Sequence, residues 1–460
     1  MSTSPSLLPS IDDNANTHSV IPQSESTEKA SGVGSGKTSE DRQQYSDFPD
    51  GGFRAWLIAM CSTFSTFGFV NSWGTFQEYY QQNMLSTLSP STIAWIGSIQ
   101  FALIFLPGLF AGRLFDIGYF RIIISSSSIL IVVATFLIPE CKTYWQFLLC
   151  QGIAVGLGCG GIYSTTIAVI AHWFKKRRGL AMGFVTSGAA IGGIFFPVVI
   201  RSLLQNVGFP WCMRTLGFVL TATLGMANLS LKRRLPPSNA GLHGMLRREI
   251  FASMPYNVYC IAGFTAFLGM YTALTFINSS AVFYGVSPGF AIYLTAIANG
   301  SSGFARPLTG YLSDRWGWFV LGIEGFDYTN HHDAGPLNII IPFTLLSAVM
   351  TYAWPFARNI ASLVIVAIIY GFATGGYISI WVNAIFAMSD TADVGHRVGF
   401  AMTILGVGAL VGPPISGAIE RSSGGFPAAG YYAGSVIVLA TLQLIWSRQL
   451  LMNGKIWGKF

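Results

Sequence analysis

The stretch that decides the fold is residues 360–386, which read IASLVIVAIIYGFATGGYISIWVNAIF. It contains no charged side chain and is long enough to cross roughly 30 Å of hydrocarbon as an α-helix. Similar apolar blocks of about 20 residues lie at approximately 54–78, 92–113, 121–139, 144–170, 179–201, 212–231, 257–281, 290–312, 338–356, 398–420 and 430–451. We therefore predict an all-α polytopic membrane protein with twelve transmembrane helices.

The composition supports lipid as the surrounding solvent. Apolar residues make up 52% of the chain and charged residues 10%, whereas about a quarter of a soluble domain is charged. Too few polar side chains exist to cover a water-soluble core of this length. The net charge of +7 comes from basic residues in short runs between apolar blocks, which is typical of a headgroup boundary. We expect a lipid bilayer as partner, and no nucleic acid.

The ends and the loops predict the topology. Residues 1–50 are rich in Ser, Thr, Asn and Gln, with almost no aromatic side chains, so we predict a disordered cytoplasmic tail. With this tail inside, the cytoplasmic loops hold most of the basic residues, including the run Lys175 to Arg178. The excess predicts that both termini are cytoplasmic. We expect an integral membrane protein of the plasma membrane, although the charge pattern itself does not identify the membrane.

An internal repeat divides the chain. Residues 112–116 read GRLFD and residues 310–314 read GYLSD, an offset of 198, while residues 178–182 (RGLAM) are echoed by residues 398–402 (VGFAM). We predict two parallel six-helix repeats, 51–231 and 255–452, joined by a cytoplasmic linker at 232–254 and followed by a tail at 453–460. Such an arrangement places a solute path between the halves, near the midplane.

The loop 318–335 is atypical for this architecture. The second pair of echoes is offset by 220 rather than 198, so the second half carries extra residues, and this acidic loop is the clearest candidate. One hypothesis is an insertion foreign to the fold, whose deletion should spare folding and transport. Its cluster His331-His332-Asp333 predicts no metal site, because adjacent residues on a loop seldom give suitable geometry.

Several motifs resemble the major facilitator superfamily. The paired Gly-x-Leu-x-Asp segments are similar to its loop signature after helices 2 and 8. Residues 50–56 (DGGFRAW) and 172–193 resemble the two signatures of its monocarboxylate porter family, and residues 73–80 (WGTFQEYY) are similar to fungal members. The resemblance covers about residues 48–452. It implies the major facilitator fold and carriage of a small organic solute by alternating access.

The chain departs from the proton-coupled members of that family. They resemble one another in a lysine late in helix 1 and in an aspartate and an arginine one turn apart in helix 8. Here Arg306 matches the arginine, Ser302 stands at the aspartate position, and residues 70–74 contain no lysine. These differences favour a solute other than the one those relatives carry.

Polar side chains within the apolar blocks are the candidate substrate-binding residues. A guanidinium inside a membrane helix is costly, so Arg306 should face a cavity or a partner, and we expect it to receive an anionic or polar group. Amides at midplane depth should face the bundle interior, and Tyr377 could add a flat wall. The other predicted contacts are Asn71, Asn299, Asn383, Trp73 and Trp381. Each of these side chains could instead make an interhelical structural bond or an ordinary packing contact.

The loop charges suggest a gate. Asp116 and Asp314 stand where inner helix ends meet, next to Arg113 and Arg315. Salt bridges there would hold the inner side shut and break as the halves rock. Each of these charges could instead be a solvated topology anchor.

Nothing in the sequence indicates catalysis. It shows no nucleophile constellation, no ATP motif and no metal cluster, so we expect no enzyme, no metal and no cofactor. The function predicted first is a secondary-active or facilitative transporter of a small carboxylate-type metabolite, with or without protons. The chain could also be an exporter of a fungal secondary metabolite, an importer of a larger vitamin-like anion, or a transceptor that binds without transport.

Overall fold

A computed structural model describes residues 60–174, 177–231, 252–315, 335–389 and 394–452 of the chain. Within these ranges the regular structure is helical and no strand occurs. The predicted tails at 1–50 and 453–460 lie outside the described residues, as do nearly all of the predicted linker and of the atypical loop. Those predictions stay untested.

The first half of the chain forms six helical passes. The first pass runs from Met60 to Met84 and the second from α4 to α5, and the remaining passes follow as hairpins. Its labelled elements are η1 (Phe64–Gly68), α3 (Trp73–Tyr79), η2 (Tyr80–Met84), α4 (Pro90–Ala102), α5 (Gly108–Ile117), α6 (Phe120–Leu137), η3 (Ile138–Glu140), α7 (Tyr144–Phe147), η4 (Leu148–Ala154), α8 (Val155–Trp173), α9 (Arg178–Asn206) and α10 (Gly208–Ser230).

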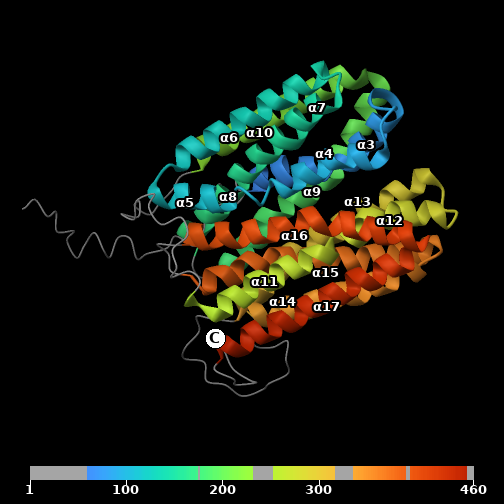
Figure 1. Cartoon of the computed structure of the whole chain (residues 1–460). Coiled ribbons are helices and arrows are strands. Elements are labelled where there is room, and N and C mark those ends of the chain that lie inside the picture. Colours follow the sequence, from blue (N-terminus) through green and yellow to red (C-terminus); the bar gives the residue numbers. More distant parts are fainter. Residues whose placement is uncertain (1–59, 175–176, 232–251, 316–334, 390–393, 453–460) are drawn as a thin grey trace, which may run out of the picture. The chain divides into compact units, whose positions relative to one another are not determined.

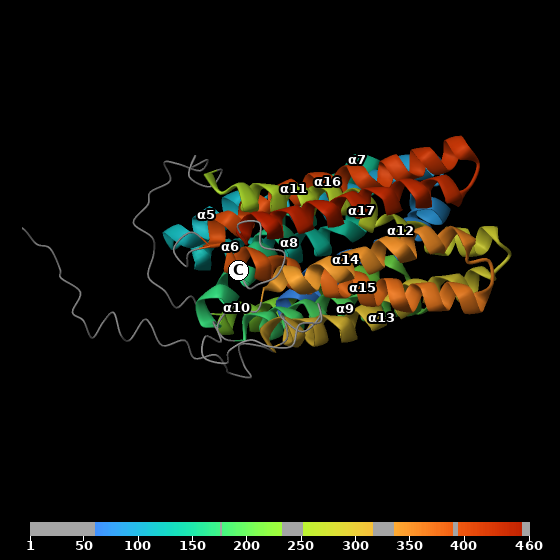
Figure 2. The same cartoon turned by 90° about the horizontal axis from the view of Figure 1, so that it is seen from below.

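The second half also forms six passes. Its elements are α11 (Met254–Met270), α12 (Thr272–Phe283), α13 (Pro288–Arg315), α14 (Pro336–Ala353), η7 (Trp354–Phe356), α15 (Ile360–Ala387), α16 (Val394–Ser423) and α17 (Phe426–Leu451). The predicted all-α fold, with twelve passes in two six-helix halves, is confirmed over the described residues. Figure 1 shows α4 to α10 on one side of the bundle and α11 to α17 on the other, and in the view from below in Figure 2 the second set lies in front of the first.

Eight of the described passes are both long and apolar enough to count as membrane spans by length and composition. Of the other four, two are interrupted helices and two are continuous helices of lower hydropathy. The first pass is broken at Asn71 and Ser72, and the second between α4 and α5, where Pro107 has no N–H to continue the helix. In α10 and α13, polar residues such as Arg214 and Arg306 lower the hydropathy.

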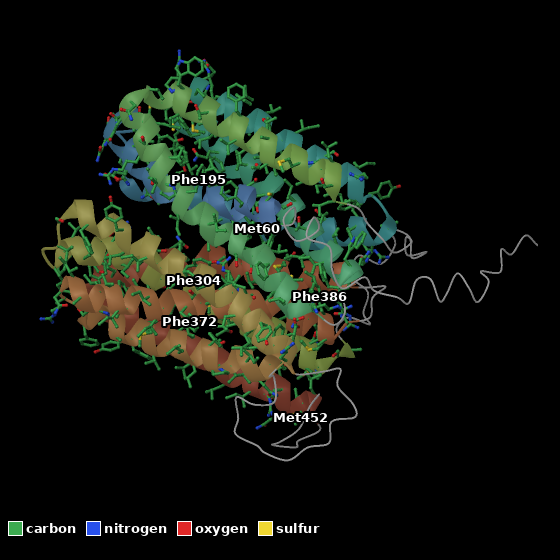
Figure 3. The ribbon with its side chains drawn as sticks, turned by 180° about the vertical axis from the view of Figure 1, so that it is seen from behind. Met60, Phe195, Phe304, Phe372, Phe386 and Met452 are labelled. Carbon is green, nitrogen blue, oxygen red and sulfur yellow. The ribbon has the colours of Figure 1, made fainter. Side chains whose placement is uncertain are left out.

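The outward helix faces carry large apolar side chains. Phe304 of α13 is 80% exposed, Leu229 of α10 is 81% exposed and Phe218 is 62% exposed. Figure 3 shows side chains along the outer surface of the bundle, with Phe304 labelled. Apolar exposure over whole helix faces would be costly in water, and it indicates contact with lipid.

The two halves approach most closely at the end that holds Asp116 and Asp314, which we call the aspartate end. A Cβ added to Gly310 of α13 would lie 2.1 Å from the carbonyl oxygen of Gly179. Further along α13, a Cβ on Gly303 would lie 3.3 Å from Ala190, and one on Gly300 would lie 3.8 Å from Ile194. The α9–α13 spacing therefore widens away from the aspartate end.

Candidate functional site

A cavity lies between the two halves, beyond the close contact at the aspartate end. About 860 Å³ of space free of protein atoms lies within it, a volume that includes the solvent at its open side. Both halves supply its walls. The polar and aromatic lining residues are Thr63, Phe67, Asn71, Phe105, Tyr163, Thr186, Phe267, Tyr271, Asn299, Ser302, Arg306, Thr374, Tyr377 and Trp381.

Arg306 is the charged group in this lining. It lies on α13 with 6% of its surface exposed. Its Nε donates to Ser302 Oγ at 3.1 Å, and its Nη1 donates to the backbone carbonyl of Thr186 on α9. These two bonds hold the guanidinium at the cavity wall and leave further N–H groups of the fork for a ligand.

Two asparagines meet at the wall formed by α9. A Cβ built on Gly193 would lie 3.0 Å from the amide nitrogen of Asn299 and 3.3 Å from that of Asn71. Asn71 belongs to the first half and Asn299 to the second, and Gly193 leaves the room in which both amides fit. Neither side-chain amide has a hydrogen-bond partner in the part of the chain that the structure describes.

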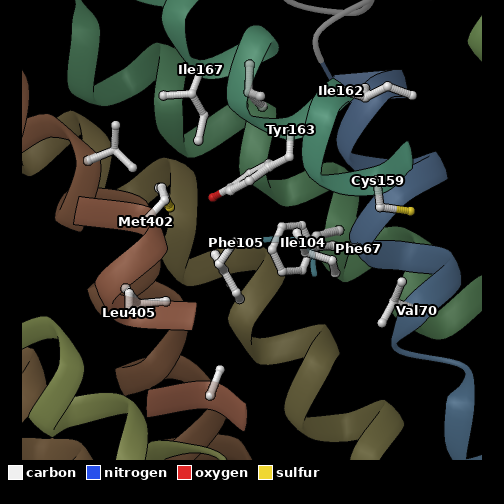
Figure 4. Close-up of a cluster of buried hydrophobic side chains, with 14 of the residues drawn as sticks. Phe67, Val70, Ile104, Phe105, Cys159, Ile162, Tyr163, Ile167, Met402 and Leu405 are labelled. Carbon is white, nitrogen blue, oxygen red and sulfur yellow. The ribbon is translucent and has the colours of Figure 1, made fainter. Parts of the chain in front are cut away.

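Aromatic rings form much of the remaining wall and join the halves. Phe101 and Tyr271 meet edge to face with centroids 4.6 Å apart, and Phe105 and Phe267 meet at 5.6 Å. Figure 4 shows Tyr163 beside the Phe67 and Phe105 rings, with its hydroxyl on the side of Met402. Such surfaces suit a flat apolar ligand body.

Two further donors on α15 lack partners. The Tyr377 hydroxyl and the Trp381 indole nitrogen are buried, and neither has a hydrogen bond to any described residue. The Trp381 ring stacks on Tyr259 at 5.6 Å and packs over Gly263 of α11. None of the lining residues, all within the described ranges, is acidic. The cavity therefore offers one positive charge and several further N–H and O–H donors without an acidic group, which favours a ligand with acceptor oxygens or a negative charge.

The structure brings four of the six predicted substrate-binding residues to the cavity: Arg306, Asn71, Asn299 and Trp381. Asn383 instead donates to Ser313 Oγ at 2.9 Å beside Gly179, near the aspartate end. Trp73 donates to Gln77 Oε1 at 2.8 Å and covers Gly97 of α4. Both therefore make structural contacts away from the cavity lining.

The predicted gating aspartates lie at the contact between the halves. Asp314, near the end of α13, accepts hydrogen bonds from the backbone N–H groups of Gly179 and Leu180 at 2.8 and 2.7 Å. These two residues start α9, whose N-terminus carries the positive end of a helix dipole. Each oxygen of the carboxylate thus caps the first turn of a helix from the other half.

Asp116 makes the equivalent contact in the other junction. It is 2% exposed on α5 and accepts a hydrogen bond from the backbone N–H of His396, in the first turn of α16, at 2.8 Å. Arg113 is buried one turn earlier on α5, and the Arg315 guanidinium lies over the Tyr311 ring at 5.1 Å. We predicted salt bridges between these carboxylates and nearby arginines. In the structure, each carboxylate accepts hydrogen bonds from backbone N–H groups at the start of a helix in the opposite half.

Sequence reasoning missed the aromatic wall residues Phe67, Phe105, Tyr163, Phe267 and Tyr271. A signal for some of them does exist. Phe105 precedes the break at Pro107, and Tyr163 follows the glycine-rich start of α8, while Tyr271 is itself the break between α11 and α12. Aromatic residues next to helix breaks and glycine runs would have pointed to part of the wall.

Comparison of the sequence with known proteins identifies the family of the chain. The sequence pattern of the Major Facilitator Superfamily matches residues 55–324. "MFS-type transporter 1" of Ophiocordyceps sp. (strain BCC 1869) is 33% identical over 408 residues, covering 88% of this chain and 87% of the relative. The "Aspyridones efflux protein apdF" of Emericella nidulans is 32% identical, covering 89% and 80%. The "Fujikurins efflux protein" of Gibberella fujikuroi is also 32% identical, covering 87% and 84%.

Solved structures share the fold at low sequence identity. The human organic anion transporter MFSD10 (TETRAN) superposes with a TM-score of 0.66 at 13% identity, covering 85% of this chain and 99% of that one. The proton:xylose symporter XylE superposes with a TM-score of 0.67 at 14% identity, covering 86% and 95%. At this identity the two structures support the fold alone.

Proposed function

Because the chain belongs to the major facilitator superfamily and is a membrane transporter of that fold, we propose that it exports an amphipathic organic metabolite by alternating access. The observation that carries the proposal is the cavity between the halves, whose aromatic walls surround Arg306 and several unpartnered donors. Two relatives that cover most of the chain are named as efflux proteins for particular metabolites. A fungal secondary metabolite would fit a cavity with aromatic walls and hydrogen-bond donors.

A small carboxylate, the solute predicted first from the sequence, has less support than a larger metabolite. Arg306 could bind such an acid, and this residue together with the porter-like signatures keeps a monocarboxylate carrier as the second candidate. A solute the size of lactate, however, would leave most of the aromatic wall and the asparagine pair without contacts. An importer of a vitamin-like anion, or a transceptor that binds without transport, would use the same cavity.

The gate in this proposal is the aspartate end. The basic residues Arg177 and Arg178 stand there at the start of α9, so the positive-inside rule makes this end cytoplasmic. In that orientation the described conformation is closed toward the cytoplasm and widens toward the outside. Export then requires the carboxylate bonds of Asp116 and Asp314 to break when the cavity opens inward and to re-form once the solute is bound. The plasma membrane is the proposed location.

Two measurements test this function. The first compares intracellular and secreted metabolites in cells that make the protein and in cells in which its gene is disrupted. Export predicts that at least one metabolite accumulates inside the disrupted cells and returns to the medium when the gene is restored. Unchanged profiles, or a solute that the intact cells take up instead, would refute export.

The second measurement separates the two leading candidates. The purified chain in liposomes is given labelled 2-naphthoate and 4-phenylbutyrate, or lactate and acetate, with and without a pH gradient. Our proposal predicts transport of the aromatic acids and little transport of lactate. Selective transport of lactate driven by the pH gradient would instead establish a monocarboxylate carrier. The same comparison shows whether protons are coupled to the solute.

A further inference from the structure

The polar groups of the cavity fall into two clusters. The first is Arg306, held by Ser302 and by the carbonyl of Thr186. The second is the pair of amides from Asn71 and Asn299 above Gly193. The first cluster is positively charged and well bonded, whereas the second is neutral and has no partner among the described residues. The two clusters therefore offer different chemistry to a ligand.

The spacing of the clusters follows from helix geometry on α13. The Cα atoms of Asn299 and Arg306 are two helical turns apart on one face of this helix, about 10 Å along its axis, and the bond to Ser302 turns the guanidinium toward Asn299. The antiparallel helix α9 gives an independent measure. Thr186, which contacts Arg306, and Gly193, which contacts Asn299, are also two turns apart. Both helices thus place the backbone positions of the two clusters two turns apart.

The wall near these clusters is aromatic. Phe67 and Phe105 of the first half and Phe267 and Tyr271 of the second half line the cavity, and the Phe105 and Phe267 rings meet across the halves. A ligand body lying along α13 would pass these rings, with one end at the arginine and the other at the amides. Flat rings of the ligand would gain contacts there that a flexible alkyl chain would not.

We propose that the cavity is a two-point site for an elongated aromatic acid. Its anionic group binds Arg306, and an acceptor oxygen, such as a ketone or amide carbonyl, binds Asn71 and Asn299 about two helical turns away. This inference rests on the proposed function and specifies the chemical class of its solute. An acid of the same length without the acceptor oxygen would bind Arg306 but make no hydrogen bond to the two amides. A short acid could not contact Arg306 and the amides at the same time.

The amide pair makes the site sensitive to the position of the two halves. Asn71 and Asn299 come from different halves and meet at Gly193. A single carbonyl oxygen can accept from both amides, because it carries two lone pairs. The acceptor end of the solute therefore binds both amides only when the halves are correctly spaced. Solutes without this oxygen lose that link.

The test uses four probes that differ in one feature at a time. 4′-Acetylbiphenyl-4-carboxylate carries a ketone about as far from its carboxylate as two helical turns. 4′-Isopropylbiphenyl-4-carboxylate has the same shape without the acceptor, and 4-acetylbenzoate has both groups at half the distance. Benzoate supplies the acid alone. Binding to the purified full-length chain in detergent is measured by isothermal titration calorimetry.

For the unmodified chain we expect the acetylbiphenyl acid to bind on the order of tenfold more tightly than its isopropyl analogue, the effect of one well-made hydrogen bond to otherwise unpaired groups. Asn299→Leu should reduce this ratio to about one. Arg306→Gln should weaken both biphenyl acids alike and keep the ratio. Asn278→Leu, which removes an amide bonded to Thr295 outside the cavity lining, is the matched control and should leave the ratio unchanged.

Equal binding of the two biphenyl acids, including a failure of both to bind, would overturn the two-point site. So would a ratio that survives Asn299→Leu together with Asn71→Leu, or binding of 4-acetylbenzoate as tight as that of the long ketone. These outcomes are separable from a failure of the proposed function. A chain that exports a metabolite with a ratio of one refutes the two-point site alone, whereas a preserved ratio without transport refutes export alone.

Discussion

Two junctions join the halves at the aspartate end, and the internal repeat makes them equivalents. In the first, α9 packs against α13, and in the second, α16 packs against α5. In both, an aspartate at the end of one helix accepts hydrogen bonds from the start of the other. In both, glycines bring the backbones so close that an added Cβ would meet a carbonyl oxygen. The repeat has thus kept the closing device in duplicate.

The junctions differ one to two turns deeper, where the cavity begins. The α9–α13 junction there carries Thr186, Ser302 and Arg306, and it ends at Gly193 and Asn299. The α5–α16 junction has Gly108 at the position that the repeat offset relates to Arg306. Its polar contact is Thr403, which bonds the backbone of the α4–α5 break. The first junction therefore combines closing with polar groups of the proposed binding site, whereas the second contributes the apolar lining residues Met402 and Leu405.

The largest effect is expected at Arg306, the charged residue that distinguishes the α9–α13 junction from the α5–α16 junction. Arg306→Gln keeps a polar but shorter side chain and removes the charge and the planar fork. Charge-assisted hydrogen bonds are worth about 1.5–3 kcal/mol, so transport of an anionic solute should fall by more than tenfold. Arg306→Lys, which keeps the charge without the fork, should recover part of it. Unchanged transport by correctly folded Arg306→Gln would remove this residue from the site.

The next effect concerns the glycines, which can be compared along one helix. In Gly310→Ala the new methyl group would meet the Gly179 carbonyl at 2.1 Å, whereas in Gly300→Ala the nearest atom, on Ile194, is 3.8 Å away. Overpacking costs about 1–3 kcal/mol, so Gly310→Ala should shift the population toward opening at the aspartate end by on the order of tenfold. Gly300→Ala should behave like the parent.

The measurement is the rate at which a maleimide added on the aspartate side labels a cysteine placed at Met402, which lines the cavity. The parent for this experiment lacks the six native cysteines. Faster labelling in Gly310→Ala than in Gly300→Ala supports closure by backbone contact. Equal rates would mean that the junction tolerates the extra methyl group and that closure depends on other contacts.

The sequence predicts the parts of this comparison that depend on one residue or one helix. Apolar length predicts the twelve passes, the cost of a charge in lipid singles out Arg306, and the GxLxD repeat identifies Asp116 and Asp314. The carboxylate partners depend on the packing of one half against the other. No sequence pattern states that the N–H groups of Gly179 and His396 would face these aspartates, so salt bridges were the natural expectation.

The aromatic residues show the same limit. Trp73 and Trp381 have similar sequence surroundings, since each lies in an apolar block close to glycines. The structure separates them. The Trp73 indole packs over Gly97 within its own half, while Trp381 lines the cavity and packs over Gly263. Which glycine each ring covers is a matter of helix rotation, which the hydropathy pattern leaves undetermined.

A smaller effect compares the two aspartates. Asp314→Asn keeps one acceptor oxygen and loses the negative charge that faces the start of α9. Charges at helix N-termini contribute about 0.3–1 kcal/mol, and up to about 2 kcal/mol when partly buried. The maleimide labelling at Met402→Cys should therefore rise several-fold. Asp116→Asn should act in the same direction through α16. If either variant left the labelling unchanged, its carboxylate would be an anchor and not a gate.

The smallest effect lies in the α5–α16 junction, whose cavity-lining residues Met402 and Leu405 are apolar. The Thr403 hydroxyl accepts from Leu109 N–H at 3.1 Å and donates to the Leu106 carbonyl at 3.0 Å, so it joins the α4–α5 break to the first turn of α5. Thr403→Val preserves the shape and leaves these backbone groups unpaired, which should cost about 1 kcal/mol in thermal unfolding of the detergent-purified chain. Thr403→Ser keeps the hydroxyl and should stay near the parent. Because Thr403 itself does not line the cavity, the affinity for 4′-acetylbiphenyl-4-carboxylate should not change, and a drop in affinity at unchanged stability would show that this contact also shapes the binding site.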